Sequence, residues 1–187
     1  MMDAVKFISG VGQLHTNEPD PEKPKKILKP YLSIGIADIQ ALVDNPPTVS
    51  KPNSQWIMAS SYPSRVFKEQ EQHGSFQMLW ADLDNNPPPI AELAVIVEKI
   101  IGNYDYELYN TASATPKNQK ARLLIWLDEP MKFPEWLITQ EILNEKLESF
   151  DVIPDDANLR AGQLCYLPNR GAIYNSASKR GGHHERL

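Results

Sequence analysis

The chain has 187 residues, a formal net charge of −5 and 41% hydrophobic residues, which suits one globular domain with a core. This charge excludes a protein that coats nucleic acid through overall positive charge, although a local basic groove remains compatible with it. The single cysteine, Cys165, excludes an intramolecular disulfide framework and favours a cytoplasmic protein. No stretch has the length and apolarity of a membrane span and no signal-peptide pattern opens the chain, so we expect no membrane partner.

The first 74 residues predict a small α/β extension. Residues 15–30 are polar and rich in proline, which is typical of an extended segment. Apolar residues at helical spacing predict a helix over 36–43, which Asn45-Pro46-Pro47 ends. Residues 55–60 are expected to form a strand, and residues 61–74 a loop or a poorly packed helix.

The pattern becomes regular from residue 75. It predicts a strand at 75–84, a helix at 90–101, strands at 104–109 and 120–127, a helix at 133–150 and a strand at 163–167. This β-α-β-β-α-β order is the ferredoxin-like or RRM-like unit, an α+β fold. In it the first strand lies between the third and the fourth, and two helices cover one face while the other stays open. We expect this domain over 75–175, the extension over 1–74 and a flexible basic tail over 176–187, in a single compact unit.

Two carboxylates stand at the end of the first of these strands. Asp82 and Asp84 are two residues apart, so both side chains leave the same face, which they share with Phe76, Met78 and Trp80. Neighbouring carboxylates repel unless a proton or a cation separates them, and a hard divalent ion is a common solution. An ordinary polar strand end that runs into an Asn-Asn-Pro turn remains the alternative.

Basic and hydroxyl side chains are expected beside this pair. The strand at 120–127 runs antiparallel to the strand at 75–84, so its first residues, Lys120 and Arg122, lie beside the two carboxylates. A pair of cations next to a metal site suits a triphosphate. The turn over 110–119 is rich in threonine, serine and asparagine, which can donate hydrogen bonds to phosphate oxygens.

Three segments carry a resemblance that covers roughly residues 30–175: Trp80-Ala81-Asp82-Leu83-Asp84, the stretch 109–125 with Thr111-Ala112-Ser113-Ala114-Thr115-Pro116, and Gln163 to Gly171. Together they resemble primases of phages and plasmids in the archaeo-eukaryotic primase superfamily. The resemblance implies a primase-polymerase palm that joins nucleotides on a DNA template by a two-metal mechanism in plasmid or phage replication. Mg²⁺ or Mn²⁺ would be the cofactor. The partners would be single-stranded DNA, NTPs or dNTPs, and a helicase in cis or in trans.

The expected site follows from the resemblance and from the strand positions. Asp82 and Asp84 would hold the metal ions. The nucleotide would be bound by Ser113, Thr115, Lys120 and Arg122. Arg160, Tyr166 and Arg170, in a basic and aromatic stretch, would contact the template by phosphate contacts and stacking.

The family also implies a third metal-binding carboxylate. Asp128 is excluded because it ends a strand antiparallel to the first, which places it about 20 Å from Asp84. The link before the last predicted strand should begin beside the end of the first strand. We therefore expect the third carboxylate at Asp156 or Asp155, with Asp156 preferred because it is nearer the strand.

One departure keeps other functions open. Many members of the superfamily have a histidine after the serine of the second motif, whereas residues 111–115 contain none. This absence favours the alternative of a non-catalytic replication initiator or single-stranded nucleic-acid-binding module that stacks bases on Phe76, Trp80 and Tyr106. A nuclease or nicking relaxase would need a histidine cluster on a strand, which the sequence lacks.

Overall fold

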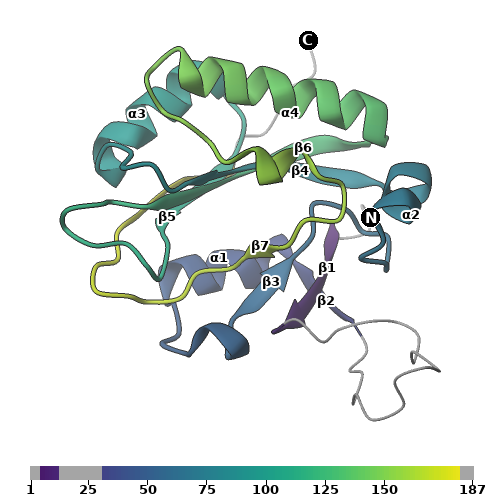
Figure 1. Cartoon of the computed structure of the whole chain (residues 1–187), viewed down its shortest axis with the longest axis horizontal. Helices are drawn as coiled ribbons and strands as arrows, with labels where there is room; N and C mark the ends of the chain where they lie inside the picture. Colours follow the sequence, from purple (N-terminus) through teal and green to yellow (C-terminus); the bar gives the residue numbers. More distant parts are fainter. Residues whose placement is uncertain (1–4, 13–30, 182–187) are drawn as a thin grey trace.

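In the part of the chain that the structure describes, two antiparallel sheets of four strands each lie in layers, with two helices on the outer face of one of them (Figure 1). The computed structural model describes residues 5–12 and 31–181. One sheet has the order β4-β6-β5-β8 and the other the order β2-β1-β3-β7. The α+β fold class predicted from the sequence is thus confirmed. No helix in these two ranges is long and apolar enough to cross a membrane.

The first sheet and its helices form the palm. Its elements, in chain order, are β4 (Phe76–Leu83), α3 (Ile90–Ile101), β5 (Tyr106–Asn110), β6 (Ala121–Met131), α4 (Phe133–Glu148) and β8 (Ser176–Lys179). Helix α3 buries Ile90, Leu93 and Val97, which lie on one side at helical spacing. It ends at Gly102, whose φ of 67° favours a residue without a side chain. The first five of these elements match the predicted ones in order and type.

The second sheet and its helix come mainly from the first 74 residues. Strands β1 (Lys6–Val11), β2 (Leu32–Gly35) and β3 (Gln55–Ile57) are joined by β7 (Cys165–Tyr166) from the far end of the chain. Helix α1 (Ile36–Asp44) ends before Pro46, as predicted, and α2 (Phe67–His73) lies within the stretch expected to be loop or poorly packed helix. The predicted extended segment 15–30 lies outside the described residues.

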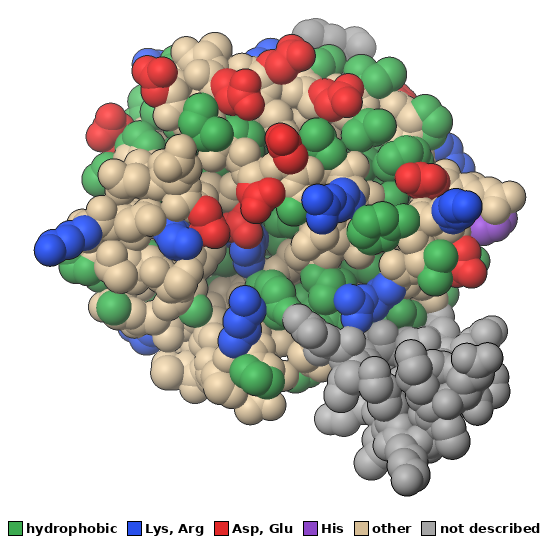
Figure 2. Space-filling view, viewed as in Figure 1, with side chains coloured by type: hydrophobic (Ala, Val, Ile, Leu, Met, Phe, Trp, Pro, Cys, Tyr) green, Lys and Arg blue, Asp and Glu red, His purple; other side chains and the backbone are tan. Residues whose placement is uncertain are grey.

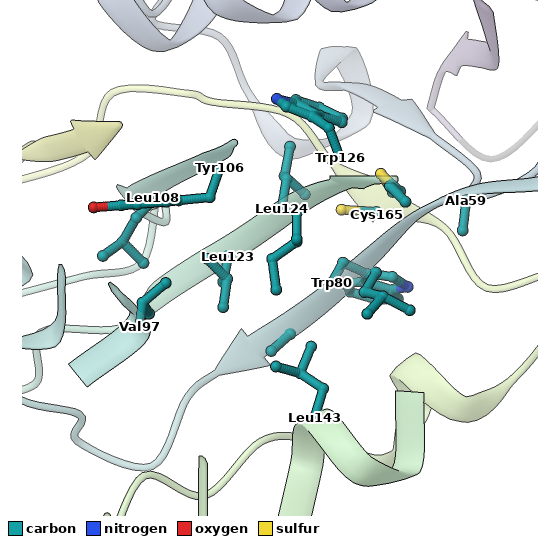
Figure 3. Packing of buried hydrophobic residues seen from close by; sticks show 14 of the residues in the cluster. Ala59, Trp80, Val97, Tyr106, Leu108, Leu123, Leu124, Trp126, Leu143 and Cys165 are labelled. Carbon is teal, nitrogen blue, oxygen red and sulfur yellow. The ribbon is translucent and has the colours of Figure 1, made fainter. Parts of the chain in front are cut away.

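The face of the palm away from α3 and α4 is covered, not open. Alternate residues of β6 point to opposite sides, so Leu123 faces the helices while Leu124 and Trp126 face the second sheet (Figure 3). The Trp126 ring lies 5.6 Å from that of Phe7 in β1. Buried residues of both sheets form one hydrophobic cluster.

The fourth strand of the palm is not the predicted one. Residues 163–167 were expected to pair with the strand at 75–84, but Cys165 and Tyr166 pair with β3 of the second sheet. The fourth strand is instead β8, which pairs with β5 and leaves β4 at the edge of the sheet. Residues 176–179 therefore belong to a strand, whereas the sequence predicted a flexible tail there; residues 182–187 lie outside the described part.

Side chains and a loop satisfy the free edge of β4. Trp136 Nε1 donates to the Met78 carbonyl at 2.9 Å, and the Gln140 amide bonds to both the N–H and the carbonyl of Trp80. Asn158 Nδ2 also donates to the Trp80 carbonyl, at 2.9 Å, and the Asp155 N–H donates to the Asp82 carbonyl at 2.9 Å. Because buried backbone groups need partners, these bonds account for the absence of a neighbouring strand.

Candidate active site

Asp82 and Asp84 line a cleft between the two sheets, with a volume of about 440 Å³. Asp82 is directly opposite Arg122 in the pairing of β4 with β6, so the start of β6 lies beside the end of β4 as the sequence predicted. The Asp82 side chain is 22% exposed and that of Asp84 is 50% exposed. The more buried carboxylate thus lies deeper in the cleft, and the other lies at its rim.

Each carboxylate forms an ion pair with one of the two predicted basic residues. Arg122 Nη2 lies 2.6 Å from Asp82 Oδ2, and Lys120 Nζ lies 3.3 Å from Asp84 Oδ2. Burial by itself lowers the pKa of Arg122, but the negative charge of Asp82, together with the hydrogen bond to Asp82 and the neighbouring Cys165 and Tyr109, outweighs this effect and raises the pKa above its usual range. The guanidinium is therefore charged, and the two basic groups balance the two carboxylates.

Arg122 has a second partner in the other sheet. Its Nη1 donates to the Tyr166 carbonyl oxygen of β7 at 2.6 Å, and the same oxygen accepts a hydrogen bond from the Tyr109 hydroxyl at 2.9 Å. Burial raises the pKa of Tyr109 well above its ordinary value, so this hydroxyl stays protonated. Arg122 therefore connects the carboxylate end of β4, in one sheet, to β7 in the other sheet.

Of the two candidates for a third carboxylate, the structure places Asp155 in the cleft. Its N–H is bonded to the Asp82 carbonyl, and it lines the same cleft as Asp82 and Asp84. Its Oδ1 accepts the N–H of Ala157 at 2.8 Å, as the cap of the short 3-10 helix η2 (Asp156–Leu159). Asp156, which was the preferred candidate from the sequence, is exposed on that helix and is not among the lining residues. The link lies beside the end of β4 as expected, but the predicted strand order was wrong, because the strand after the link pairs with β3 and not with β4.

The turn over 110–119 contributes only in part to the cleft. Thr111, Ala112 and Ser113 line it. Thr115 does not, because its backbone and hydroxyl bond to Asn118 in a tight turn. Asn118 Nδ2 in turn donates to the Asp84 carbonyl at 3.3 Å, which fixes the turn against the end of β4.

The three predicted template residues are dispersed. Tyr166 lines the cleft. Arg160 and Arg170 are exposed and do not line it; the Arg170 guanidinium lies 5.6 Å from the centre of the Tyr174 ring. Arg180, which belongs to the same basic stretch, is bound by acidic side chains at the other end of the palm: it pairs with the buried Glu107 of β5 and with Asp44 of α1, both at 2.8 Å.

One wall of the cleft comes from the first 74 residues, and none of its residues was predicted from the sequence to belong to the site. Val49, Lys51 and Ser54 line the cleft together with Asn169. The Asn169 amide bonds to the N–H and the carbonyl of Val49 at 2.9 and 2.7 Å, and its Nδ2 also lies 3.1 Å from Ser54 Oγ. No local pattern marks Val49 or Lys51, but Asn169 lies within the last family-like segment, Gln163 to Gly171, and this position was a sequence signal for the site.

The carboxylates offer suitable donors for a divalent cation but not a complete ligand set. Oxygen donors are what Mg²⁺ and Mn²⁺ prefer. Asp82 Oδ1 is buried and has no hydrogen-bond partner, which leaves a carboxylate oxygen available for an ion. Among the described residues, no three His, Cys, Asp or Glu side chains are gathered closely enough to hold a metal. An ion bound here would take its other ligands from water and from the substrate.

The aromatic residues of the non-catalytic alternative are not available for stacking. Phe76, Trp80 and Tyr106 are at most 2% exposed. Phe76 packs at 4.4 Å on Trp136 of α4, beyond a register irregularity between Phe76 and Met78, and so does not share the face of Asp82. Bases could contact at most the small exposed part of Trp80 in the cleft.

With its α+β palm and a second sheet over the face away from the helices, the chain has an archaeo-eukaryotic-primase-like fold. Among solved structures, it is similar to the AEP domain of the primase-polymerase (PrimPol) of cyanophage S-2L, with a TM-score of 0.50 over 98% of this chain and 84% of that chain. The two sequences are 10% identical, so the likeness shows the fold alone. No protein-family model matches the sequence, and no curated protein matches it.

Proposed function

We propose that this domain is the catalytic palm of a primase-polymerase that adds nucleotides to a primer end on a single-stranded DNA template. The observation that carries the proposal is the pair Asp82 and Asp84 in a cleft, with Asp82 Oδ1 buried and unpartnered. A buried carboxylate oxygen without a donor is costly, and a cation would relieve that cost. The fold shared with a phage primase-polymerase supports this choice among the metal-dependent functions.

In this proposal Mg²⁺ or Mn²⁺, held by Asp82 and Asp84, would supply activation of the attacking 3′-hydroxyl and stabilisation of the leaving pyrophosphate. Asp155 is the proposed third carboxylate, because it lies in the cleft and its backbone is bonded to Asp82. Metal coordination would require its side chain to exchange the cap of η2 for the ion.

Lys120 and the turn beside it are the proposed contacts for the incoming NTP or dNTP. Lys120 is 26% exposed, and its partner Asp84 lies at the rim, so a triphosphate can reach the ammonium group without breaking a buried pair. Ser113 lines the cleft and offers a hydroxyl, whereas Thr115 would support the turn. Tyr166 is the proposed template contact within the cleft, and Arg160 and Arg170 would bind the backbone outside it.

A template-dependent incorporation assay tests the proposal. We expect the chain to extend a primed single-stranded template with labelled nucleotide when Mn²⁺ or Mg²⁺ is present, and not after treatment with a chelator. Synthesis that ignores the template, or degradation of the template instead of synthesis, would contradict it. A helicase, as a further domain or as a separate protein, is a proposed partner that this assay does not require.

The non-catalytic nucleic-acid-binding module remains the second candidate, because residues 111–115 hold no histidine to contact a nucleotide. This candidate predicts a different outcome of the incorporation assay from that expected for a primase-polymerase. Single-stranded DNA would bind equally well with and without divalent cations, and no nucleotide would be incorporated under any metal condition.

A further inference from the structure

Arg122 lines the cleft but exposes little of its side chain there. It is 8% exposed, both of its terminal nitrogens are engaged, and its Nε is buried without a hydrogen-bond partner. A triphosphate could reach it only by displacing Asp82 or the Tyr166 carbonyl. Lys120, by contrast, does not line the cleft itself, but it is 26% exposed and pairs with the half-exposed Asp84, which does line it. The two basic residues of β6 are therefore not equivalent, although their spacing suggested one shared role.

The guanidinium of Arg122 bridges the two sheets. One nitrogen holds Asp82 of β4, the other holds the backbone of Tyr166 in β7, and β4 and β7 belong to different sheets. The rigid planar fork of arginine can make both bonds at once, which the single nitrogen of a lysine cannot do with the same geometry. The Tyr109 hydroxyl shares the Tyr166 carbonyl and braces it from β5.

The ion pair with Arg122 also determines which oxygen of Asp82 remains available to an ion. Oδ2 is taken by Arg122 at 2.6 Å, while Oδ1 is buried without a partner. A carboxylate held in this way presents one oxygen in a fixed direction. Groups that orient metal-binding side chains commonly contribute a factor of about 10 to 100 in metal affinity.

We propose that Arg122 is a positioning residue, which fixes Asp82 so that Oδ1 faces the divalent cation, and that it is not a ligand of the nucleotide. This inference rests on the proposed function, since it needs a cation at Asp82. It gives the two basic residues different roles. Lys120 binds the triphosphate, whereas Arg122 binds the Asp82 carboxylate and connects it to the second sheet.

The test is a Mn²⁺ titration of the full chain, without DNA or nucleotide, followed by the electron paramagnetic resonance signal of free Mn²⁺. We expect the wild type to bind and Asp82→Ala to lose binding. Arg122→Lys and Arg122→Gln should each weaken Mn²⁺ binding by about 10- to 100-fold, because neither can hold Asp82 and Tyr166 together. Arg180→Lys, in an arginine–carboxylate pair outside the cleft, is the matched control and should bind like the wild type.

If Arg122 acted only as a positive charge that competes with Mn²⁺ for Asp82, its replacement would have the opposite effect on Mn²⁺ binding. Removal of a positive charge beside a carboxylate would tighten Mn²⁺ binding in Arg122→Gln, and Arg122→Lys would resemble the wild type; either result overturns the inference. Arg122→Lys keeps the buried charge, so it tests the inference even if Arg122→Gln does not fold. Circular dichroism checks that each variant is folded.

Nucleotide kinetics give a second, separate measure. At saturating Mn²⁺, Arg122→Lys should lower kcat and leave the nucleotide KM near that of the wild type, whereas a nucleotide ligand would raise KM. No Mn²⁺ binding by the wild type would contradict the proposed function and the inference together. Binding that depends on Asp82 but is normal in Arg122→Lys would contradict the inference alone.

Discussion

Gln140 of α4 pairs with Trp80 of β4 as a neighbouring strand would. Its Oε1 accepts the Trp80 N–H at 3.1 Å, and its Nε2 donates to the Trp80 carbonyl at 2.8 Å. Gln140 is fully buried and stands in the apolar stripe of α4 with Trp136, Leu143 and Leu147. It satisfies the edge of the strand that ends in the two carboxylates, two residues before Asp82.

Replacement of Gln140 by leucine should therefore destabilise the domain. The change keeps the volume roughly constant but leaves the buried Trp80 N–H without its partner, which costs about 1–3 kcal/mol. Urea unfolding followed by tryptophan fluorescence measures the loss. Gln72→Leu, at an exposed position of α2, is the control and should change stability by less than about 0.5 kcal/mol. Equal stability of the two variants would contradict the role given to Gln140.

The close approach of Gly171 to the turn at Ala112 gives a second prediction. A Cβ at Gly171 would lie 2.1 Å from the Ala112 carbonyl oxygen, so Gly171→Ala must push apart two segments that border the cleft. We expect a loss of about 1–3 kcal/mol in stability and weaker nucleotide binding, because Ala112 and Ser113 line the cleft.

Gly35→Ala is the matched control, since a Cβ there meets its nearest atoms at an ordinary 3.6 Å. Thermal unfolding and nucleotide titration of both variants provide the comparison. A Gly171→Ala protein as stable as Gly35→Ala would show that the two segments are not in contact.

The Cys165 thiol predicts a dependence of stability on pH. Burial raises its pKa to about 12, whereas the unfolded thiol ionises near its ordinary value of about 8.5. The folded state therefore holds a proton that the unfolded state releases. The stabilising contribution is complete below about pH 8.5 and is lost as the pH rises towards 12. By pH 10 the loss is about 2 kcal/mol.

Comparison with Cys165→Ala isolates this contribution, because every other titrating group is common to both proteins. The difference in unfolding free energy between them should shift by about 2 kcal/mol from pH 8 to pH 10, in the direction that disfavours the wild type. A difference that stays constant with pH would mean that the thiol is not buried. Iodoacetamide should likewise modify Cys165 at pH 8 only after unfolding.

Lys120→Ala should raise the nucleotide KM and leave single-stranded DNA affinity unchanged. The reason is that the ammonium group lies at the rim beside Asp84 and is accessible to a triphosphate. Neither lysine of this segment lines the cleft itself, but Lys120 is paired with the cleft residue Asp84, so Lys117→Ala, an exposed lysine earlier in the same turn, serves as the control. If Lys120→Ala instead weakened DNA binding at an unchanged KM, the assignment to the nucleotide would be wrong.

Helices and strands with a clear local pattern of apolar and terminating residues were predicted correctly from the sequence. Helix α3 has an apolar stripe and a glycine stop, and its bounds came out as predicted. The neighbourhood of Asp82 and Arg122 was predicted because antiparallel pairing of two strong strands fixes their register.

Elements that depend on distant partners were not predictable in the same way. β7 has two residues and β8 reads Ser-Ala-Ser-Lys, so neither has an apolar pattern that names its neighbour. The edge of β4 is satisfied by the amides of Gln140 and Asn158, which sequence patterns treat as solvent-exposed polar residues. The ion pairs of Arg122 and Lys120 also look alike in sequence, and only burial separates them.

In the proposed function, Asp82 and Asp84 carry metal-dependent nucleotide incorporation. The most direct measurement is primer extension by the single variants Asp82→Ala and Asp84→Ala, each shown by circular dichroism to be folded, beside Asp128→Ala, which changes an exposed carboxylate outside the cleft. We expect both cleft variants to lose incorporation and Asp128→Ala to retain it. Near-normal synthesis by the folded Asp82→Ala and Asp84→Ala proteins would contradict the proposed function.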